Sequence, residues 1–358
     1  MDLIKKSFSA IQNYTYLNTP GIGLISKKVY DFRKEKYEDL YQTGSEMMMS
    51  GALIFPEVRE KIAKIYHGEP AFVSLHPAFS FGFNAVLEGL KPGLKILLLK
   101  DDYPSINHAV EARDFKVSYA NIEENLEENI GDKFKSFQPD VFIFSQIQYL
   151  NGIKIDFSFI DELKKNFPNT LFIADGTQYL GTLGFDFKNS GIDILGASAY
   201  KWMGAGLGNG FFMFKPEIED FLKPKNLGFA SSLGKYKEEG DTLIGKFEGN
   251  HLDPASIGSI KIALDFQEEV GFDKIAEKVK KLTKLAKSAF EDLNLLEEKV
   301  KNRKEHSSIF NLKADQKMFE KLQNQQVLCS QRGEGIRVGF HYYNTTEDLE
   351  KLLEILKE

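Results

Sequence analysis

The sequence predicts an α/β fold in which a large domain with a mainly parallel sheet is followed by a smaller C-terminal α+β domain. Short apolar runs alternate with helical or loop segments between about residues 95 and 215, an order that favours a parallel sheet. The runs are nearly continuous in apolar residues, as strands covered on both faces are. After about residue 250 the pattern changes to long helices and short strands. We therefore expect a large domain over 16–250 and a small one over 251–358, with residues 1–15 packed on the small domain.

The elements of the large domain are expected in a regular order. A helix before the first strand is predicted by apolar residues at helical spacing, namely Phe79, Phe83, Val86, Leu87 and Leu90. A later helix is predicted in the same way over 157–167. The strands are expected at 95–100, 141–145, 171–174, 194–197 and 211–214.

The small domain is expected to begin with two helices, over 255–270 and about 275–289. Short strands should follow near 308–312, 326–330 and 336–340. The chain then ends in a helix, because leucines repeat at helical spacing after Thr345-Thr-Glu-Asp348, a segment with the pattern of a capping box.

Composition excludes several classes of protein. The formal net charge is -6 and the lysines are dispersed, so no nucleic-acid surface is expected. The chain has a single cysteine, which fits a reducing compartment. No segment approaches the roughly 20 apolar residues that span a bilayer, and the N-terminus lacks the pattern of a signal peptide. The histidines show no metal-ligand spacing. We expect a cytoplasmic protein without a membrane segment or a metal site.

Two charged residues follow directly on apolar runs. Asp175 ends the run that starts at Thr170, and Lys201 follows the run that starts at Asp193. If both runs are parallel strands, their carboxyl ends meet at one edge of the sheet, where ligands bind in open α/β folds. Pyridoxal phosphate (PLP) requires a lysine for its Schiff base and an acid against its pyridinium nitrogen. The pair therefore predicts a PLP site.

Simpler interpretations exist for each residue alone. Lys201 precedes the glycines of Gly204-Ala-Gly-Leu-Gly-Asn-Gly210, and an exposed lysine before a glycine-rich turn explains this segment equally well. Asp175 precedes Gly176, a common position for a turn or N-cap aspartate. A strand rather than a helix follows the glycines, and the chain has no G-x-x-x-x-G-K-[ST] motif, so nucleotide-binding loops are poorly matched.

Other residues support a phosphorylated ligand. Ser80 lies in the first turn of the helix predicted from Phe79, and helix N-termini bind phosphate through free N–H groups. An ordinary N-cap serine explains Ser80 on its own. Gln178 stands three residues after Asp175, where its amide could reach the same crevice.

Two segments together resemble the signature of the class V aminotransferase family of PLP enzymes. They are Ala174-Asp-Gly-Thr-Gln178 and Ser198-Ala-Tyr-Lys-Trp202, the second with the glycines that follow it. The resemblance covers most of the chain, from Tyr16-Leu-Asn-Thr-Pro-Gly21 to Gly335-Ile-Arg-Val338 and Tyr343-Asn-Thr345. This family, of fold type I, also contains cysteine desulfurases, kynureninases, selenocysteine lyases and epimerase-like members. The resemblance implies a PLP-dependent transferase-like fold and a homodimer that builds each site at the subunit interface.

The resemblance also implies roles for individual residues. Lys201 would form the Schiff base and shuttle a proton at the substrate Cα, and Asp175 would keep the pyridine nitrogen protonated. Tyr103 would stack on the cofactor ring, and Gln178 would hydrogen-bond its phenolic oxygen. The phosphate would be held by Ser80, Ser198 and Tyr200, and across a dimer interface by His251. Arg337 would grip the substrate carboxylate, although a surface ion pair is the alternative for this arginine.

Three departures from the family pattern bear on these roles. The usual phosphate loop reads Ala78-Phe79-Ser80, which leaves Ser80 as its principal hydroxyl. Tyr200 stands where a histidine often precedes the lysine. His251 stands near a position often occupied by threonine, and a surface histidine explains it as well.

Cys329 bears on the reaction. It lies eight positions before Arg337, in a segment that is predicted to be a strand, whereas a desulfurase needs a nucleophilic cysteine on a mobile loop. A buried apolar role for Cys329 is therefore expected, and cysteine desulfuration is disfavoured. We expect an aminotransferase acting on amino acids and keto acids. The alternatives are a kynureninase-like or selenocysteine/cysteine lyase-like enzyme, an epimerase, a PLP-fold binding module without catalysis, and an unrelated nucleotide-binding α/β enzyme.

Overall fold

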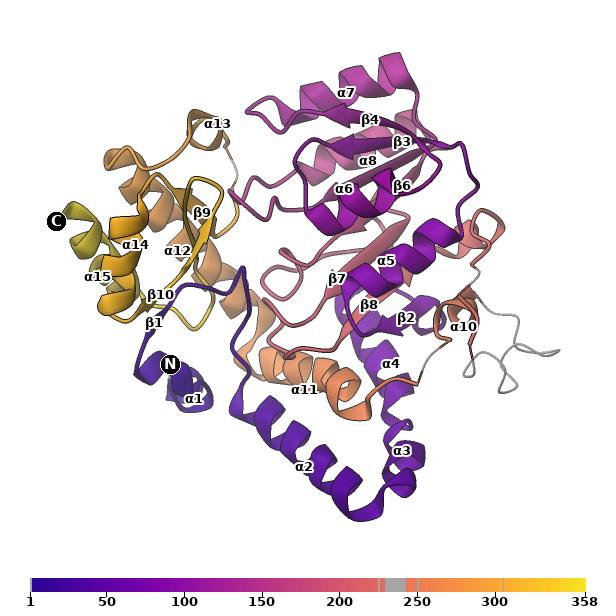
Figure 1. Cartoon of the computed structure of the whole chain (residues 1–358), viewed down its shortest axis with the longest axis horizontal. Coiled ribbons are helices and arrows are strands. Elements are labelled where there is room, and N and C mark those ends of the chain that lie inside the picture. Colours follow the sequence, from indigo (N-terminus) through magenta and orange to yellow (C-terminus); the bar gives the residue numbers. More distant parts are fainter. Residues whose placement is uncertain (1, 225, 229–242, 250, 305) are drawn as a thin grey trace.

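A seven-stranded sheet forms the centre of the computed structural model, which describes residues 2–224, 226–228, 243–249, 251–304 and 306–358 (Figure 1). Within this part the strand order is β2-β8-β7-β6-β5-β3-β4. Only β8 runs antiparallel to its neighbours, so the predicted mainly parallel sheet is confirmed. The strands are β2 (Val73–His76), β3 (Lys95–Leu99), β4 (Lys116–Ala120), β5 (Val141–Ser145), β6 (Leu171–Asp175), β7 (Ile194–Ser198) and β8 (Gly210–Phe214).

Helices cover both faces of this sheet, which explains why its strands are continuous in apolar residues. In β5, for example, Phe142 and Phe144 pack into one hydrophobic cluster while Val141 and Ile143 pack into the other. No helix in the described ranges is long and apolar enough to cross a membrane. The helical elements around the sheet are α4 (Ile54–Tyr66), η2 (Pro70–Phe72), α5 (Phe79–Glu88), α6 (Pro104–Glu111), α7 (Leu126–Phe137), α8 (Phe157–Asn166), η3 (Pro216–Asp220) and α10 (Leu243–Phe247).

The C-terminal part contains a small antiparallel sheet in the order β11-β12-β9. Its strands are β9 (Ile309–Leu312), β11 (Ser330–Arg332) and β12 (Gly335–Gly339). Its helices are α11 (Pro254–Val270), α12 (Phe272–Asp292), α13 (Glu298–Lys301), α14 (Gln316–Asn324) and α15 (Thr346–Lys357). The capping box expected before the last helix is confirmed, since Asp348 N donates to Thr345 Oγ1 and Thr345 N donates to the Asp348 carboxylate.

The strand expected at 326–330 is divided in the structure. Val327–Leu328 forms β10, which pairs in parallel with β1 (Thr15–Tyr16), whereas β11 pairs with β12. Cys329 lies between the two short strands. One extended segment thus has two different pairing partners, which its apolar pattern could not reveal.

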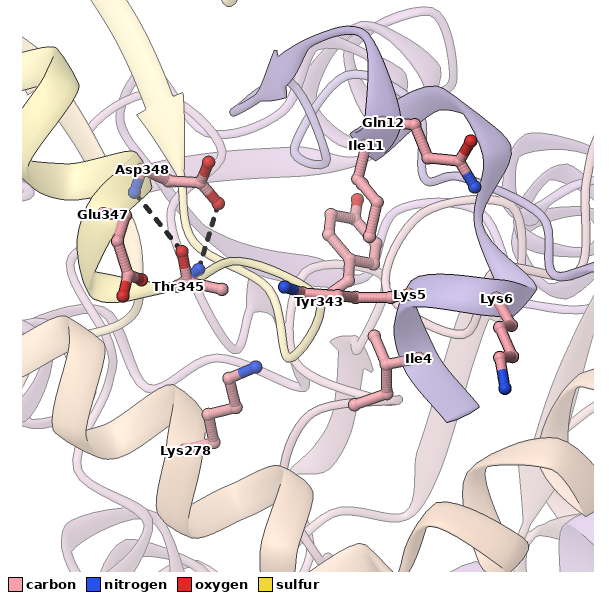
Figure 2. Close-up of a pocket in the computed structure, with 10 residues that line it drawn as sticks. All are labelled: Ile4, Lys5, Lys6, Ile11, Gln12, Lys278, Tyr343, Thr345, Glu347 and Asp348. Atoms are coloured by element: carbon pink, nitrogen blue, oxygen red, sulfur yellow. Dashed lines mark hydrogen bonds between the residues drawn. The ribbon is translucent and has the colours of Figure 1, made fainter. Parts of the chain in front are cut away.

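The N-terminal segment contacts elements of the C-terminal part through β1, and also through α1 (Asp2–Ser7) and η1 (Ser9–Gln12). Ile4 and Ile11 line a cavity of about 620 Å³ together with Lys278 of α12 and Tyr343 (Figure 2). The long helix α11 packs against α2 (Lys27–Thr43), α3 (Ser45–Gly51) and α4. The division into domains 16–250 and 251–358 stays a prediction.

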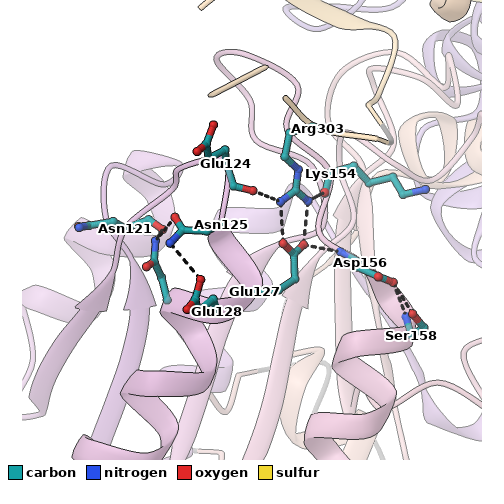
Figure 3. Close-up of polar contacts among 10 residues, drawn as sticks. Asn121, Glu124, Asn125, Glu127, Glu128, Lys154, Asp156, Ser158 and Arg303 are labelled. Carbon is teal, nitrogen blue, oxygen red and sulfur yellow. Dashed lines mark hydrogen bonds and ion pairs between the residues drawn. The ribbon is translucent and has the colours of Figure 1, made fainter. Parts of the chain in front are cut away.

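An ion pair joins α7 to the segment after α13. Both terminal nitrogens of Arg303 contact the Glu127 carboxylate, at 2.6 and 2.7 Å (Figure 3). Arg303 also donates to the carbonyls of Glu124 and Lys154, and Glu127 accepts a hydrogen bond from Asp156 N. The two-pronged geometry and the added backbone contacts make this a stronger pair than most surface pairs. It ties the segment after α13 to the start of α7 and to the loop before α8.

A stretch before α2 crosses directly over the turn that holds Lys201. Gly23 N donates to Tyr200 O at 3.0 Å. A Cβ atom on Gly23 would lie 1.7 Å from Lys201 O, a distance that no packing adjustment of a side chain could relieve. Gly23 is therefore required by the close approach of two backbone segments.

We predict that Gly23→Ala lowers the free energy of unfolding by about 1–3 kcal/mol, the usual cost of forcing atoms into a packed site. The matched control is Gly131→Ala in α7, where an added Cβ meets no atom within 4 Å. That change should stabilise the protein by about 0.5–1 kcal/mol through helix propensity. Denaturant unfolding measures both, and an unchanged midpoint for Gly23→Ala would contradict the close approach.

Candidate functional site

Lys201 lies buried at the carboxyl edge of the large sheet, three residues after β7. Its Nζ is 5.5 Å from the centre of the Tyr103 ring and 5.6 Å from that of Tyr200. The pKa of Lys201 is lowered to about 8, mainly by burial; Asp175 acts to raise it, and Arg337 and Arg332 act to lower it. The interpretation as an exposed surface lysine is therefore wrong. Lys201 is an amine that is partly neutral near physiological pH.

The loop after Lys201 depends on glycine. Gly204, Gly206 and Gly208 have φ values of 70°, 75° and 86°, in the region that other residues rarely adopt. The loop then returns as β8, antiparallel to β7. Alternate left-handed residues make the tight reversal that leaves the Lys201 side chain at the sheet edge.

Asp175 is the last residue of β6, next to β7 in the sheet, and it is also buried. Thr177 N donates to Asp175 Oδ1 at 2.8 Å. Burial raises the pKa of Asp175 to about 6, although Thr177 and Lys201 act in the opposite direction. A buried carboxylate of this kind gains from a cation placed against it, and a pyridinium nitrogen is such a cation.

Asp102 organises the neighbouring strand ends, a role that the sequence analysis missed. Its carboxylate accepts hydrogen bonds from Tyr103 N at 2.7 Å, Ser145 N at 2.8 Å and Gln148 Nε2 at 3.0 Å. These bonds fix Tyr103 where its ring faces Lys201. A signal was present in the sequence, because Asp102 comes three residues after the apolar strand β3, as Lys201 comes three residues after β7.

Trp202 sets the orientation of the Gln178 amide. No role in the site was predicted for Trp202 from the sequence. Trp202 Nε1 donates to Gln178 Oε1 at 2.7 Å, and Gln178 Nε2 donates to Pro20 O at 3.0 Å. The indole can only donate, so the amide oxygen must face it. One amide hydrogen is left for another acceptor, and the expected contact with the phenolic oxygen of the cofactor stays a prediction.

The start of α5 contacts Ser198 rather than a side chain of its own N-cap. Phe79 N donates to Ser198 Oγ at 2.9 Å, and Ser198 N donates to Thr177 Oγ1 at 3.0 Å. Ser198 therefore lies between the helix start and the loop of Asp175. Ser80 is half-buried and lines a cavity of about 540 Å³ with His76, Phe81 and Asn84. Phosphate binding by Ser80 and Ser198 stays a prediction.

Tyr200 and His251 have different surroundings. Burial raises the pKa of Tyr200 to about 12, so its hydroxyl is neutral and could hold a phosphate only by a hydrogen bond. His251 is exposed, two residues before Asp253, the N-cap of α11. A contact of His251 with the phosphate of a neighbouring protomer stays a prediction.

Arg337 in β12 reaches the same site from the small sheet. Its Nη1 donates to Tyr149 O at 2.8 Å, and the Tyr149 ring lies edge-on to Tyr103 at 5.4 Å. Arg337 is only 3% exposed, so the alternative of a surface ion pair is wrong. Its buried Nε has no hydrogen-bond partner among the described residues. A buried donor without a partner is rare, and it fits a ligand carboxylate.

Cys329 does not share this site. Its side chain is buried, and burial raises the pKa of the thiol to about 11. Gln323 Nε2 of α14 lies 4.0 Å from its sulfur. The next residue, Ser330, pairs with Arg337, and consecutive side chains of an extended segment point to opposite sides. The interpretation of Cys329 as a buried apolar residue is confirmed.

These residues together fit PLP. The site offers a partly neutral lysine, a buried carboxylate, an aromatic ring, a helix start and an unpaired guanidinium nitrogen. The lysine matches the aldehyde of the cofactor, the carboxylate its pyridine nitrogen, the aromatic ring its ring face and the helix start its phosphate. The guanidinium nitrogen matches the carboxylate of an amino acid. The alternative of an unrelated nucleotide-binding enzyme does not explain the buried Lys201 and Asp175.

Comparison with known proteins gives the same assignment. The model of the family "Aminotransferase class-V" matches residues 15–352. The chain is 24% identical to an "Uncharacterized aminotransferase YcbU" of Bacillus subtilis and 23% identical to a "Probable cysteine desulfurase" of Ureaplasma parvum. Each alignment covers 98% of this chain and 95% of the relative.

Solved structures show the same fold. A cysteine desulfurase of Thermococcus onnurineus superposes with a TM-score of 0.84 at 16% identity, covering 99% of this chain and 96% of that one. The cystine C-S lyase C-DES, in complex with cysteine persulfide, gives 0.85 at 18% identity, with 98% and 99% covered. Another C-DES structure carries glycine linked to PLP. Because the family model matches nearly the whole length of this chain, the chain belongs to the class V aminotransferase family of PLP-dependent enzymes.

Proposed function

We propose that this enzyme removes the Cα proton of an amino acid and passes its amino group to a keto acid, as an aminotransferase. The observation that carries the proposal is the buried amine of Lys201 between Asp175 and Arg337. PLP, when bound, accepts the electron pair that is left at Cα. The protein must then bind the substrate, orient it and move one proton.

Each of these tasks falls to a different side chain. Arg337 has a free buried Nε and binds the α-carboxylate. Lys201 takes the Cα proton, because its lowered pKa leaves part of the amine neutral near pH 7. Asp175 balances positive charge on the cofactor ring. Amino acids and keto acids both carry the carboxylate that Arg337 recognises, so one site can serve both substrates of a transamination.

A PLP-dependent lyase is the second candidate. It is favoured by the probable cysteine desulfurase among the relatives and by the C-S lyase among the structural neighbours. Cys329 does not supply a nucleophile for such a reaction, because its thiol is buried against α14 and has a raised pKa. A lyase reaction of this chain would therefore be an elimination that needs no protein thiol.

The pKa of Lys201 predicts how cofactor attachment depends on pH. Only the neutral amine attacks an aldehyde, and a pKa of about 8 makes the neutral fraction rise about tenfold from pH 7 to pH 9 before it levels off. The rate at which the apoprotein gains the visible absorbance of lysine-bound PLP should follow this curve. A rate that still rises steeply above pH 9 would show an ordinary, solvated lysine. Lys201→Ala should gain no such absorbance.

The two reactions are separated by adding alanine, aspartate, glutamate, cysteine or cystine to the holoenzyme without a keto acid. Transamination stops after one equivalent of keto acid per site, because the amino group stays on the cofactor, and it resumes when a second keto acid is added. Elimination releases ammonia and keto acid continuously. Continuous release would favour the lyase, and no reaction with any amino acid would favour the binding module without catalysis.

A Cys329→Ser variant is the control for continuous release, the outcome that favours the lyase. We expect it to keep the activity of the unmodified enzyme, because the thiol lies on the side of the small sheet that faces α14. Loss of activity with unchanged cofactor absorbance would indicate that Cys329 acts as a nucleophile after all.

We also infer that the enzyme is a homodimer. Large apolar side chains are exposed in α2, α3 and the turn after α3, with Tyr41 87%, Met49 80% and Leu53 75% exposed. Exposed apolar patches of this kind mark protein interfaces. The N-terminus of α11 lies close by, since Gly51 faces Pro254 and Gly208 of the loop after Lys201 faces Ser256. A second copy covering this surface would therefore border the PLP site.

Light scattering should give twice the mass of one chain. Leu53→Glu should lower the mass toward that of a monomer, because it places a charge in the apolar contact. The control is Leu285→Glu on α12, where a leucine is 42% exposed but lies in a different helix. A monomeric unmodified protein, or equal masses for the two variants, would contradict the proposed interface.

A further inference from the structure

The hairpin of β11 and β12 presents two arginines on one face. Ser330 pairs with Arg337, and Arg332 pairs with Gly335. Directly opposed residues of an antiparallel pair have their side chains on the same face, as do residues two apart along a strand. Ser330, Arg332 and Arg337 therefore share the face that carries Arg337 to Tyr149. Arg332 is the diagonal neighbour of Arg337, at a typical Cα separation of about 7–8 Å.

The tip of the hairpin lies against the loop that follows β5. Gly333, next to Arg332, has a φ of 58°, and an added Cβ there would lie 3.5 Å from the Leu150 side chain. Leu150 follows Tyr149, whose carbonyl accepts from Arg337. The contact fixes the hairpin tip beside the loop that also carries the aromatic partner of Tyr103. Arg332 thus lies at the mouth of the site rather than on a remote surface.

This face has polar groups that lack partners. Arg337 Nε and Ser330 Oγ are buried and have no hydrogen-bond partner in the described ranges. Arg332 is exposed, and its Nη1 donates to the carbonyl of Gln331 at 2.9 Å. Among the described residues Arg332 forms no ion pair, including with Glu334 in the same turn. Buried polar atoms without partners point to a ligand.

Charge leads to the same conclusion. Lys201, Arg332 and Arg337 are three cationic groups, and both arginines lower the pKa of Lys201. Arg332 also lowers the pKa of Arg337, although burial is the larger cause. Asp175 opposes this positive charge near Lys201. An α-carboxylate on Arg337 would balance one arginine and leave the other uncompensated. Like charges held this close favour a substrate with two anionic groups.

We propose that the amino acid substrate carries a second anionic group on its side chain, and that Arg332, with the Ser330 hydroxyl, binds that group while Arg337 binds the α-carboxylate. The inference rests on the proposed function, because it names the substrate class of the same site. It assigns Arg332 and Ser330 to specificity, with no part in proton transfer. Acidic amino acids and their keto acids are the substrates expected.

The test compares glutamate with norvaline, which has the same carbon chain but no side-chain carboxylate. The unmodified holoenzyme should have a kcat/KM for glutamate at least tenfold above that for norvaline. Arg332→Gln should lower kcat/KM for glutamate by about 10- to 100-fold, the effect of losing one charge-assisted hydrogen bond, and should lower that for norvaline far less. Arg113→Gln, which removes an arginine paired with Glu88, is the control and should change neither.

A binding measurement needs no turnover. Glutarate and pentanoate, titrated into the holoenzyme while the absorbance of bound PLP is followed, should show tighter binding of the dicarboxylate, and Arg332→Gln should remove the difference. Equal losses for both ligands would show that Arg332 serves the α-carboxylate and would overturn the inference. If the enzyme turned over norvaline as efficiently as glutamate, the inference would also be overturned, while the proposed function would stay intact. No turnover of either amino acid, with glutarate still bound selectively, would contradict only the proposed function.

Discussion

Two ionisable side chains, Lys201 and Asp175, are buried at one edge of the large sheet, and the surrounding elements are organised around them. Lowering the pKa of a lysine to about 8 corresponds to about 3 kcal/mol against its charged form. Asp175 is destabilised in its charged form for the same reason. Each group partly offsets the cost of the other, and a cofactor with an aldehyde and a pyridinium nitrogen would relieve both.

The surrounding elements hold this costly pair in place. The N-terminal segment crosses the Lys201 turn through Gly23 and binds Gln178 through Pro20 O. Asp102 joins the ends of β3 and β5 and fixes Tyr103. These hydrogen bonds hold Tyr103 and Gln178 in place independently of any ligand. Such preorganisation reduces the cost of ordering the site on binding.

The two faces of the small sheet carry different side chains, arginines on one and the cysteine on the other. Ser330, Arg332 and Arg337 share one face of the hairpin, whereas Cys329 packs against α14. The alternation that places the two arginines on one face therefore puts the single thiol on the other. The ion pair of Arg303 and Glu127 joins α7 of the large sheet's surroundings to the segment after α13 (Figure 3).

The α/β class, the strands around Asp175 and Lys201 and the cofactor were all predictable from the sequence. Each depends on local patterns, such as apolar runs, helical spacing and a charge at a strand end. The contributions of Asp102, Gln148 and Trp202 to the site became visible in the folded chain, because they depend on contacts between residues far apart in the sequence. Folding also divided the segment around Cys329 between two pairing partners and placed Arg332 beside Arg337. Strand register sets which side chains share a face, and register is fixed by packing between elements rather than by any one segment.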